Sequence, residues 1–301
     1  MIGRRGFLAL AALSTVSACS IGDDAVTVRL GSGRVGGLSH TFARLLADAA
    51  AEAGTVRIDP VITAGSCTNL DLLGRGEIDA ALALSDSARE SRTRALAIGR
   101  LHECYLHLAV PAESPIHRVE DLRGARVDLG ALGSGAEISA ERVVRAAGLD
   151  PTADLQVSHR QLSDAVSALY AGEVDAIMWG AGVPTPGPDI PRRLRLIDLG
   201  GLVTVMRERF EFDYHRVTIP ADSYPGSPAV STVGVPNLLL AKPDLAHSAV
   251  SAITELLLQR ADGLAPTRTV GFQFLNRRWL VGTDAIPIHP ASVDVYRAWH
   301  G

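Results

Sequence analysis

The chain has 301 residues, a length that suits about two domains better than one simple core. Hydrophobic residues make up 47% and charged residues 21%, which is ordinary for a globular protein. The formal net charge of −4 gives no reason to expect a nucleic-acid partner, and an aromatic content of 5% leaves few side chains on which bases could stack. Composition therefore argues against nucleic-acid binding and favours a two-domain globular protein.

The N-terminus reads as an export signal. The pair Arg4-Arg5 precedes the apolar run Phe7–Leu13, which is too short to remain as a membrane-spanning helix. Val16–Cys19 then resembles a lipobox, in which Cys19 is acylated and becomes the new N-terminus. We expect residues 1–19 to be a signal peptide and the protein to be exported and lipid-anchored to the outer face of the cytoplasmic membrane. An ordinary cleaved signal peptide is the alternative, and the arginine pair suits either twin-arginine export or general secretion.

Strands and helices alternate through the first half of the chain. The expected elements are a strand at Val26–Leu30, a helix at Ser39–Ala53, a strand at Val56–Thr63, a helix at Thr68–Leu73, a buried strand at Asp79–Leu84 and an extended run within Leu96–Val110. Glycines such as Gly54 and Gly74 follow the helices, where a left-handed residue commonly ends a helix. This alternation is typical of parallel βα units.

The second half follows a similar order. Its expected elements are a strand at Arg126–Leu129, a helix at Ala136–Ala147, an extended stretch at Leu155–His159, a helix at Leu162–Tyr170, a buried strand at Val174–Trp179, a strand at Leu194–Leu199, a helix at Val203–Phe210, a turn-rich stretch at Val217–Pro236, a strand at Asn237–Ala241 and a helix at Ala246–Leu258. Short helices and an aromatic tail complete the chain.

An internal repeat links the two halves. A strand, a glycine-rich loop and a helix occur at Val28–Ala43 and again at Val127–Ala140, and G-E-I-D-A at Gly76–Ala80 recurs as G-E-V-D-A at Gly172–Ala176. We therefore expect two similar α/β lobes with ligand loops at the carboxyl ends of their strands and a ligand cleft between them. Lobe I should comprise residues 26–109 and 218–301, and lobe II residues 110–217, with each boundary placed to within about 15 residues.

The first glycine-rich loop allows two interpretations. Gly31, Gly33 and Gly36 spell G-x-G-x-x-G between a strand and a helix, and Asp59 follows near the spacing of a ribose contact, as in a dinucleotide site. However, Asp59 lies inside its strand and not at the carboxyl end. The same loop and helix N-terminus could instead bind a carboxylate or a phosphate through backbone N–H groups.

Several further residues have a structural and a functional interpretation. The serines of Gly65-Ser66 and Gly133–Gly135 either cap helices or belong to loops that donate to an anion. Arg34 is either a solvated loop charge or a partner for a ligand carboxylate. His40 either caps its helix or contacts the ligand, and Trp179 either packs in the core or lines the cleft.

Motifs for catalysis and metal binding are missing from the sequence. It contains no H-E-x-x-H, C-x-x-C or G-x-S-x-G, and its nine histidines lack metal-ligand spacing. We therefore expect no enzyme activity, no cofactor and no metal. Cys67 and Cys104 are expected to be unpaired thiols, although an oxidising compartment would allow them to pair.

Seven segments in order resemble the TAXI-type solute-binding proteins of tripartite ATP-independent periplasmic (TRAP) transporters. They are GRVGGLSHTFARLL, TAGSCTNLDLLGRGEIDAALALSD, HLAVPAESPIHRVEDLRGARVDLGALGSGAE, LYAGEVDAIMWGAGVPTP, VTIPADSYPG, STVGVPNLLLAKPDL and AIPIHPAS. The resemblance covers nearly the whole mature chain. It implies the two-lobed type II periplasmic-binding-protein fold, which closes on a small carboxylate, often glutamate or glutamine, for delivery to an integral-membrane permease driven by an ion gradient.

The resemblance also implies the ligand loops: Gly33–His40, Gly65–Asn69, Ser85-Asp86, Gly133–Gly135 and Gly180–Pro184. From these loops the expected ligand-binding residues are Arg34, Gly36, Gly37, Ser39, His40, Ser66, Asn69, Ser85, Asp86, Gly133, Ser134, Gly135, Trp179, Gly182 and Pro184. The chain departs from the family pattern at Arg34-Val35, which replace Ser-Thr, at Ser39-His40, which replace two tyrosines, and at Leu84, which replaces a glutamine.

The sequence thus predicts a monomeric solute-binding lipoprotein for a TRAP-type permease. Because Arg34 and His40 would add positive charge that the family usually lacks, a dicarboxylate is a candidate ligand beside glutamate and glutamine. An exported NAD(P)-dependent oxidoreductase that uses the Gly31–Gly36 loop, or a ligand-sensing lipoprotein for a membrane receptor, are the alternatives.

Overall fold

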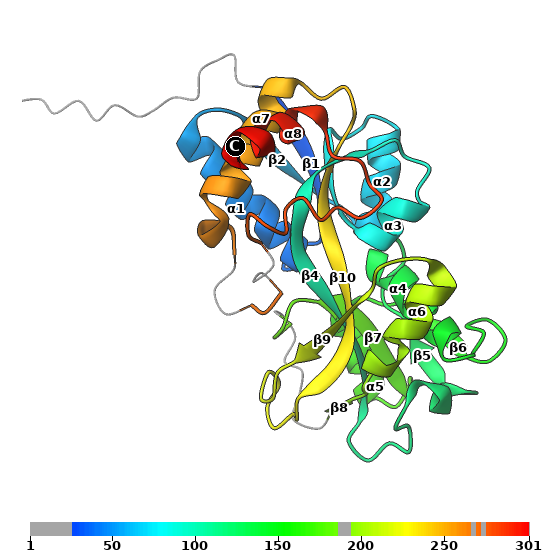
Figure 1. The fold of residues 1–301 in the computed structure, drawn as a ribbon. Coiled ribbons are helices and arrows are strands. Elements are labelled where there is room, and N and C mark those ends of the chain that lie inside the picture. Colours follow the sequence, from blue (N-terminus) through cyan, green and yellow to red (C-terminus); the bar gives the residue numbers. More distant parts are fainter. Residues whose placement is uncertain (1–25, 186–193, 266–268, 272–274, 301) are drawn as a thin grey trace, which may run out of the picture.

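The structure is a computed structural model that describes residues 26–185, 194–265, 269–271 and 275–300. The predicted signal peptide and Cys19 lie outside the described residues. Within those ranges two α/β lobes are stacked end to end (Figure 1). None of the helices in the described part of the chain combines the length and hydropathy that a bilayer span needs.

A single ten-stranded sheet runs through both lobes in the order β2-β1-β3-β10-β4-β7-β5-β6, with β8 and β9 at its sides. In lobe I it contains β2 (Arg57–Ile62), β1 (Thr27–Gly33), β3 (Ala80–Leu84) and the ends of β10 (Val230–Ala241) and β4 (Leu96–Pro111). β1 pairs in parallel with β2 and β3, whereas β10 is antiparallel to β3, β4 and β9. Parallel βα units are thus confirmed for this lobe.

Lobe II repeats this arrangement. Its strands are β5 (Arg126–Asp128), β6 (Gln156–Ser158), β7 (Ala176–Ala181), β8 (Leu194–Leu196) and β9 (His215–Ile219). β5 pairs in parallel with β6 and β7, and β7 is antiparallel to β4. β5, β6 and β7 therefore correspond to β1, β2 and β3, with β4 in the place that β10 has in lobe I.

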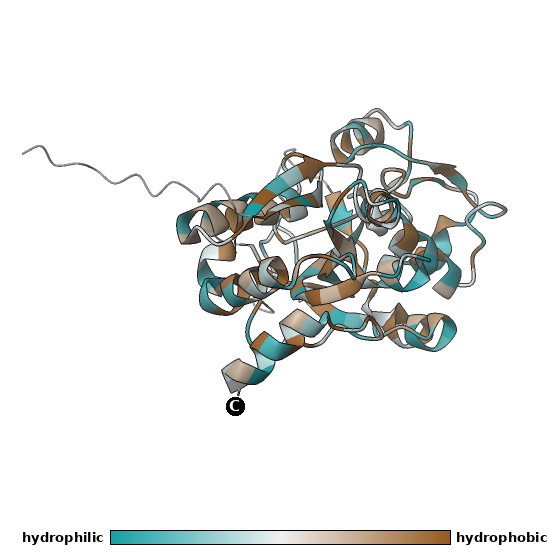
Figure 2. Ribbon diagram, turned by 90° about the horizontal axis from the view of Figure 1, so that it is seen from above, coloured by the Kyte–Doolittle hydropathy of each residue, from teal (hydrophilic) through white to brown (hydrophobic). Residues whose placement is uncertain are grey.

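Helices cover the sheet of each lobe. Lobe I has α1 (Leu38–Ala53), α2 (Ser66–Gly74), α3 (Ser85–Glu90), α7 (His247–Gln259), the 3-10 helix η3 (Ala261–Leu264) and α8 (Pro290–His300). Lobe II has η1 (Val119–Leu122), α4 (Gly135–Ala146), α5 (Leu162–Tyr170), η2 (Gly200–Leu202) and α6 (Val203–Phe210). Figure 2 shows hydrophobic residues on the central strands and hydrophilic stretches on the outer helices. Separate apolar clusters fill the two lobes, one around Phe42 and Leu46 and one around Val127 and Val143.

The G-E-x-D-A repeat gives both lobes the same contact. The guanidinium Nε of Arg29 in β1 donates to Asp79 Oδ2 at 3.0 Å, and that of Arg126 in β5 donates to Asp175 Oδ2 at 3.1 Å. Each arginine also donates to the carbonyl of the repeat's glycine, Gly76 or Gly172. The repeat in the sequence therefore corresponds to a repeated arginine–aspartate contact in the structure.

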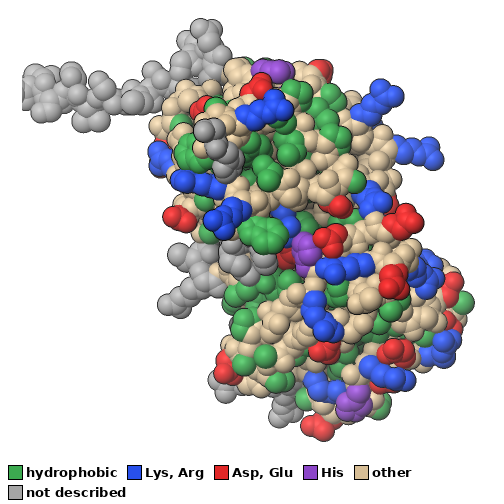
Figure 3. All heavy atoms as spheres, viewed as in Figure 1, with side chains coloured by type: hydrophobic (Ala, Val, Ile, Leu, Met, Phe, Trp, Pro, Cys, Tyr) green, Lys and Arg blue, Asp and Glu red, His purple; other side chains and the backbone are tan. Residues whose placement is uncertain are grey.

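β4 and β10 cross from one lobe to the other side by side (Figure 1). On the face drawn in Figure 3, acidic, basic and histidine side chains gather between the lobes. In β4, Glu103 accepts from Arg100 at 2.7 Å and lies 2.8 Å from His215 Nδ1 in β9. Glu103 thus pairs with Arg100 within β4 and joins β4 to β9, while a backbone ladder joins β4 to β10.

The predicted turn-rich stretch Val217–Pro236 is wrong in part, because it contains most of β9 and half of β10. Pro236 lies at a register shift in β10. A proline can be accommodated in a strand at such an irregularity. β9 and the first half of β10 pack with lobe II, since Val217, Ile219, Val233 and Val235 belong to its apolar clusters. The chain therefore returns to lobe I within β10, near Pro236.

Candidate functional site

A cavity of about 360 Å³ lies between the lobes and is lined by residues of both. Ten of the predicted ligand-binding residues line it: Arg34, Gly36, Gly37, Ser39, His40, Ser66, Asn69, Ser134, Gly135 and Trp179. Its volume is within the range of small-molecule sites. Residues from several predicted loops therefore lie together at one cavity. The contacts of each residue show its role there.

The N-terminus of α1 opens toward this cavity. Gly37 is its N-cap and gives no side-chain hydrogen bond, and the first turn carries no acidic residue. The backbone N–H groups of Leu38, Ser39 and His40 donate to no other described residue, and all three residues line the cavity. Unpaired donors at the positive end of a helix dipole form a site for an anion.

Arg34 lies in the loop that leads to this helix end. Its side chain is half-buried and makes no ion pair with a carboxylate in the described ranges. Burial lowers the pKa of its guanidinium, since the charged form loses hydration and gains no counter-ion. An anionic ligand would supply the missing counter-charge.

His40 is a neutral member of the site, which corrects the expectation that it adds positive charge. Its Nδ1 lies 2.9 Å from Ser32 Oγ, which donates to the Val61 carbonyl at 2.9 Å. The hydroxyl proton is thus used, so we assign the imidazole proton to Nδ1 and leave Nε2 as an acceptor. Burial, and then repulsion from Arg44, lowers the pKa of His40.

The loop at Gly65–Asn69 forms backbone hydrogen bonds with the other lobe. The N–H groups of Cys67 and Thr68 at the start of α2 both donate to the Gly133 carbonyl of lobe II, at 3.2 and 3.4 Å. A Cβ on Gly135 would lie 2.6 Å from Ser66 Oγ, so the two loops are in direct contact. The predicted anion site at this helix end is therefore occupied by a carbonyl of the other lobe.

Ser66 and Asn69 line the cavity, but the hydrogen bonds of their side chains are made to other residues of lobe I. Ser66 Oγ accepts from the Leu84 N–H at 3.0 Å. Asn69 Nδ2 donates to the carbonyls of Gly31 and Leu82, and its Oδ1 accepts from Thr63 at 2.5 Å. These contacts hold the loops in place and use both groups of the Asn69 amide, whereas among the described residues the Ser66 hydroxyl only accepts and keeps its proton as a donor.

The third loop is capped from within lobe II. Ser134 Oγ accepts from the Glu137 N–H at 3.3 Å, and the Glu137 carboxylate accepts from the Gly133 N–H at 2.9 Å. Serine followed three residues later by glutamate has the spacing of a capping box, although here the glutamate accepts from the residue before the cap. The capping interpretation is therefore correct for Ser134, and Glu137 supplies the anion that this helix end attracts.

Five predicted ligand residues do not line the cavity: Ser85, Asp86, Gly133, Gly182 and Pro184. Ser85 and Asp86 begin α3, a helix that the sequence did not suggest. Gly133 contributes its carbonyl to α2, as described above. Gly182 is buried close to Leu38 and Thr269, and Pro184 is exposed.

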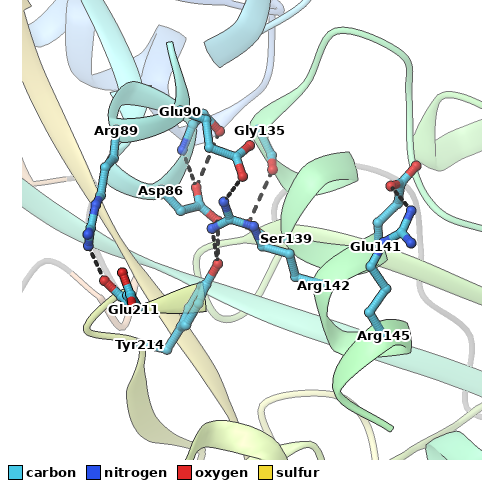
Figure 4. Close-up of polar contacts among 11 residues, drawn as sticks. Asp86, Arg89, Glu90, Gly135, Ser139, Glu141, Arg142, Arg145, Glu211 and Tyr214 are labelled. Atoms are coloured by element: carbon cyan, nitrogen blue, oxygen red, sulfur yellow. Dashed lines mark hydrogen bonds and ion pairs between the residues drawn. The ribbon is translucent and has the colours of Figure 1, made fainter. Parts of the chain in front are cut away.

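Asp86 instead joins the two lobes outside the cavity lining, through the polar contacts drawn in Figure 4. Its fully buried carboxylate accepts from Ser139 Oγ at 2.7 Å and from the Tyr214 hydroxyl at 3.2 Å, and lies 3.7 Å from Arg142 Nη1. Arg142 also pairs with Glu90 of α3. Burial raises the pKa of Asp86, while Ser139 and Arg142 act in the opposite direction. Asp86 is therefore a connection between α3 and α4, and its predicted ligand role is corrected.

Polar residues that the sequence did not single out also line the cavity: Ser32, His102, Cys104, Asp128, Arg160, Gln161, Ser163, Thr185 and Asn237. Arg160 follows β6 at the carboxyl end of a parallel strand, a place that would have marked it as a candidate. Its Nη1 donates to Asp128 Oδ2 at 3.3 Å. Asn237 lies in the antiparallel strand β10, for which no such positional rule exists.

Trp179 forms an apolar wall of the cavity and is also packed from behind. Its ring stacks on His107 at a centroid distance of 4.5 Å, and its Nε1–H donates to Thr185 Oγ1 at 2.9 Å. Burial lowers the pKa of His107 to about 3, so that the imidazole is neutral. Cys104 also lines the cavity, and both Cys104 and Cys67 are free thiols.

Residues 30–298 match the NMT1-like family. Among solved structures, the chain is similar to PhnD1 from Prochlorococcus marinus in complex with methylphosphonate, with 10% identity over 77% of this chain and 84% of that one and a TM-score of 0.52. It is also similar to XAC2383 from Xanthomonas citri bound to ATP, with 15% identity, coverage of 91% and 95% and a TM-score of 0.50. The aliphatic sulphonate binding protein SsuA from Escherichia coli matches with 18% identity, coverage of 91% and 83% and a TM-score of 0.48. The chain therefore belongs to the NMT1-like family and has the two-lobed α/β fold of periplasmic binding proteins.

Proposed function

We propose that the chain is an exported solute-binding protein that captures a small carboxylate between its lobes and delivers it to a TRAP-type permease. The observation that carries this proposal is the cavity at the open N-terminus of α1, where Arg34 lacks a counter-charge. Helix N–H donors and a guanidinium together suit a carboxylate. The ordered TAXI-like segments of the sequence support the choice of permease class.

Capture requires the lobes to open and close. The two crossing strands β4 and β10 are the hinge in this proposal, since backbone ladders there join the lobes. The contact from Cys67 and Thr68 to the Gly133 carbonyl closes one side of the cavity. A ligand that bridges the lobes would favour the closed arrangement through its differential affinity.

The remaining features of the proposal follow from the sequence. Cys19 is the lipid-anchored residue, so the protein works at the outer face of the cytoplasmic membrane as a monomer. The protein performs no chemistry and needs no cofactor. Asp59 supports this over the oxidoreductase alternative, because it pairs in register with Arg29 within β2 and does not reach the carboxyl end where a ribose contact is made.

Native mass spectrometry of the protein purified from its own host tests the proposal, with retention of a small acid as the expected result. Calorimetry with a panel of carboxylates follows, comparing the wild type with Arg34→Ala and with Arg57→Ala. Arg57 is an exposed cation of β2 outside the cavity lining and serves as the matched control. Saturable NADH binding, or the lack of any bound or binding acid, would refute the proposal.

A further inference from the structure

The charges of the cavity lining leave one uncompensated cation. Its charged side chains are Arg34, Arg160 and Asp128. Arg160 and Asp128 pair with each other, whereas Arg34 makes no ion pair with a described carboxylate. His40 and His102 do not add charge, because burial lowers the pKa of both imidazoles, that of His102 to about 3. The cavity is therefore matched to one negative charge and not to two.

The cavity offers no carboxylate to an ammonium group. Asp128 is the acidic side chain among its described lining residues, and it is fully buried. Its two oxygens already accept from the N–H groups of Gly130 and Arg160, the Ser158 hydroxyl and the Arg160 guanidinium. A buried ammonium without a partner carboxylate carries a large desolvation cost, and Arg34 would add repulsion.

Next to the anion site lies an acceptor that suits a neutral donor. Asn237 lines the cavity and is 4% exposed, and its Nδ2 donates to Ser39 Oγ in the first turn of α1 at 3.2 Å. Its Oδ1 is buried and has no hydrogen-bond partner among the described residues. A buried amide oxygen without a partner is costly, so a ligand hydroxyl or N–H at this place would be stabilising.

Lobe II contributes an apolar wall to the cavity, beside the polar side chains of Asp128, Ser134, Arg160, Gln161, Ser163 and Thr185. Side chains of α4, α5 and β7 form this wall: Ala136, Leu162, Ala165, Met178, Trp179 and Ala181. The polar groups Ser134 and Thr185 are bonded within the lobe, to Glu137 and to Trp179 and Tyr224. A ligand held at α1 by its acidic group therefore meets an apolar surface with its other end.

We infer that the ligand is a singly charged carboxylate with an apolar body and without an ammonium group, such as a hydroxy acid. This rests on the proposed function and narrows it, since it sets aside both the amino acids and the dicarboxylates. The carboxylate lies at Arg34 and the N-terminus of α1. A hydroxyl on the neighbouring carbon donates to Asn237 Oδ1, and the carbon chain lies against Trp179 and Met178.

Four probes of similar size separate these ligand classes: isocaproate, α-hydroxyisocaproate, leucine and glutarate. Calorimetry on the wild type is expected to give the tightest binding for α-hydroxyisocaproate, with leucine and glutarate at least about tenfold weaker, which is a difference of 1.4 kcal/mol. Tightest binding of leucine or glutarate would overturn this inference and leave the proposed function intact. If none of the four binds and no acid is retained by the protein from its host, both proposals fail.

Two variants of Asn237 test the role of its acceptor. In Asn237→Ala the advantage of α-hydroxyisocaproate over isocaproate should disappear, so that the two acids bind with similar affinity. Asn237→Asp places a carboxylate beside the anion site, and the preference should shift from isocaproate toward leucine. Circular dichroism checks that both variants are folded. An unchanged hydroxyl preference in a folded Asn237→Ala protein would refute the assignment, as would release of an amine-reactive ligand from the wild-type protein.

Discussion

The two lobes share one plan but complete their first loop in different ways. In lobe I, β1 leads into α1, whose N-terminus has no capping side chain and no acidic residue in its first turn. In lobe II, β5 leads into α4, which is capped by Ser134 and carries Glu137 in its first turn. A helix N-terminus attracts negative charge. In lobe II the helix end of α4 is paired with side chains of its own lobe, whereas in lobe I the helix end of α1 is open to an anionic ligand.

This difference divides the work between the lobes. Lobe I provides the open helix end, Arg34 and Asn237, all of which have capacity for a ligand. Lobe II provides the apolar wall and the Gly133 carbonyl that receives α2. A repeated strand–loop–helix unit therefore does not imply a repeated anion site, because a single glutamate at the third helical position is enough to occupy it.

The largest expected effect is on the connection between the lobes. Arg142→Ala should lower the free energy of unfolding by about 3–5 kcal/mol, because it leaves the carboxylate of Asp86 buried without its cation. Urea denaturation monitored by circular dichroism measures the change. The lobes should also unfold less cooperatively, since Arg142 of α4 joins them through Asp86 and Glu90 of α3.

Arg145→Ala is the matched control for this prediction. Arg145 lies on the same helix and pairs with Glu141 at 3.3 Å, but both side chains are more than a third exposed. Its loss should change the free energy of unfolding by no more than about 0.5 kcal/mol. Equal losses of unfolding free energy for Arg142→Ala and Arg145→Ala would mean that the Arg142–Asp86 contact drawn in Figure 4 does not bind the lobes together.

The second prediction concerns the open helix end of lobe I. Arg34→Ala should weaken the binding of the best carboxylate about 10- to 100-fold, as expected for a charge-assisted hydrogen bond of about 1.5–3 kcal/mol. The stability of the unliganded protein should not fall, because Arg34 is an unpaired, half-buried cation among the described residues. Calorimetry and thermal unfolding measure both quantities. An affinity equal to that of Arg57→Ala would remove Arg34 from the site.

The third prediction compares the two Arg–Asp contacts of the repeat in acid. Burial alone would raise the pKa of Asp79, but Arg29 and Lys242 lower it from 3.8 to about 2. A lowered pKa adds stability that is present above about pH 4 and is lost as the pH falls toward about 2. Asp79→Asn should therefore cost about 2 kcal/mol at neutral pH and nothing near pH 2.

Asp175→Asn is its counterpart in lobe II. Arg126 lowers the pKa of Asp175 as well, but this carboxylate is 37% exposed against 10% for Asp79. Among the described residues it pairs with no second cation, whereas Asp79 also pairs with Lys242. Solvent screens the exposed pair, so the loss of stability should be smaller and less dependent on pH. A larger loss for Asp175→Asn, in denaturation curves recorded from pH 7 to pH 2, would contradict this difference between the lobes.

The sequence predicted the features that depend on local order. The glycine loops, the alternation of strands and helices and the G-E-x-D-A repeat gave the fold and placed Arg34 and His40 at the cleft. The capping of α4 was also readable, since Ser134 and Glu137 have the spacing of a capping box. The predicted anion site at the start of α4 was based on the repeat of the strand–loop–helix unit and not on the spacing of Ser134 and Glu137.

Other parts of the site depend on contacts between distant segments. The start of α2 looks like an open helix end until the Gly133 carbonyl from the other lobe meets it. Asp86 looks like a ligand residue at a strand end until Arg142 and Tyr214 surround it. Asn237 is more than 150 positions from the first loop, and only the pairing of β10 with β3 brings it beside Ser39.

The smallest expected effect separates two serines that the two lobes place at corresponding helix starts. Ser134→Ala removes the cap of α4 and should lower the free energy of unfolding by about 1 kcal/mol without changing ligand affinity. Ser39→Ala should do the opposite, because Ser39 Oγ caps no helix and holds the Asn237 amide beside the anion site. Its stability should stay nearly constant while affinity for a hydroxy acid falls a few-fold. If Ser134→Ala reduced affinity as much as Ser39→Ala, lobe II would contribute to the anion site, and the two lobes would share that role.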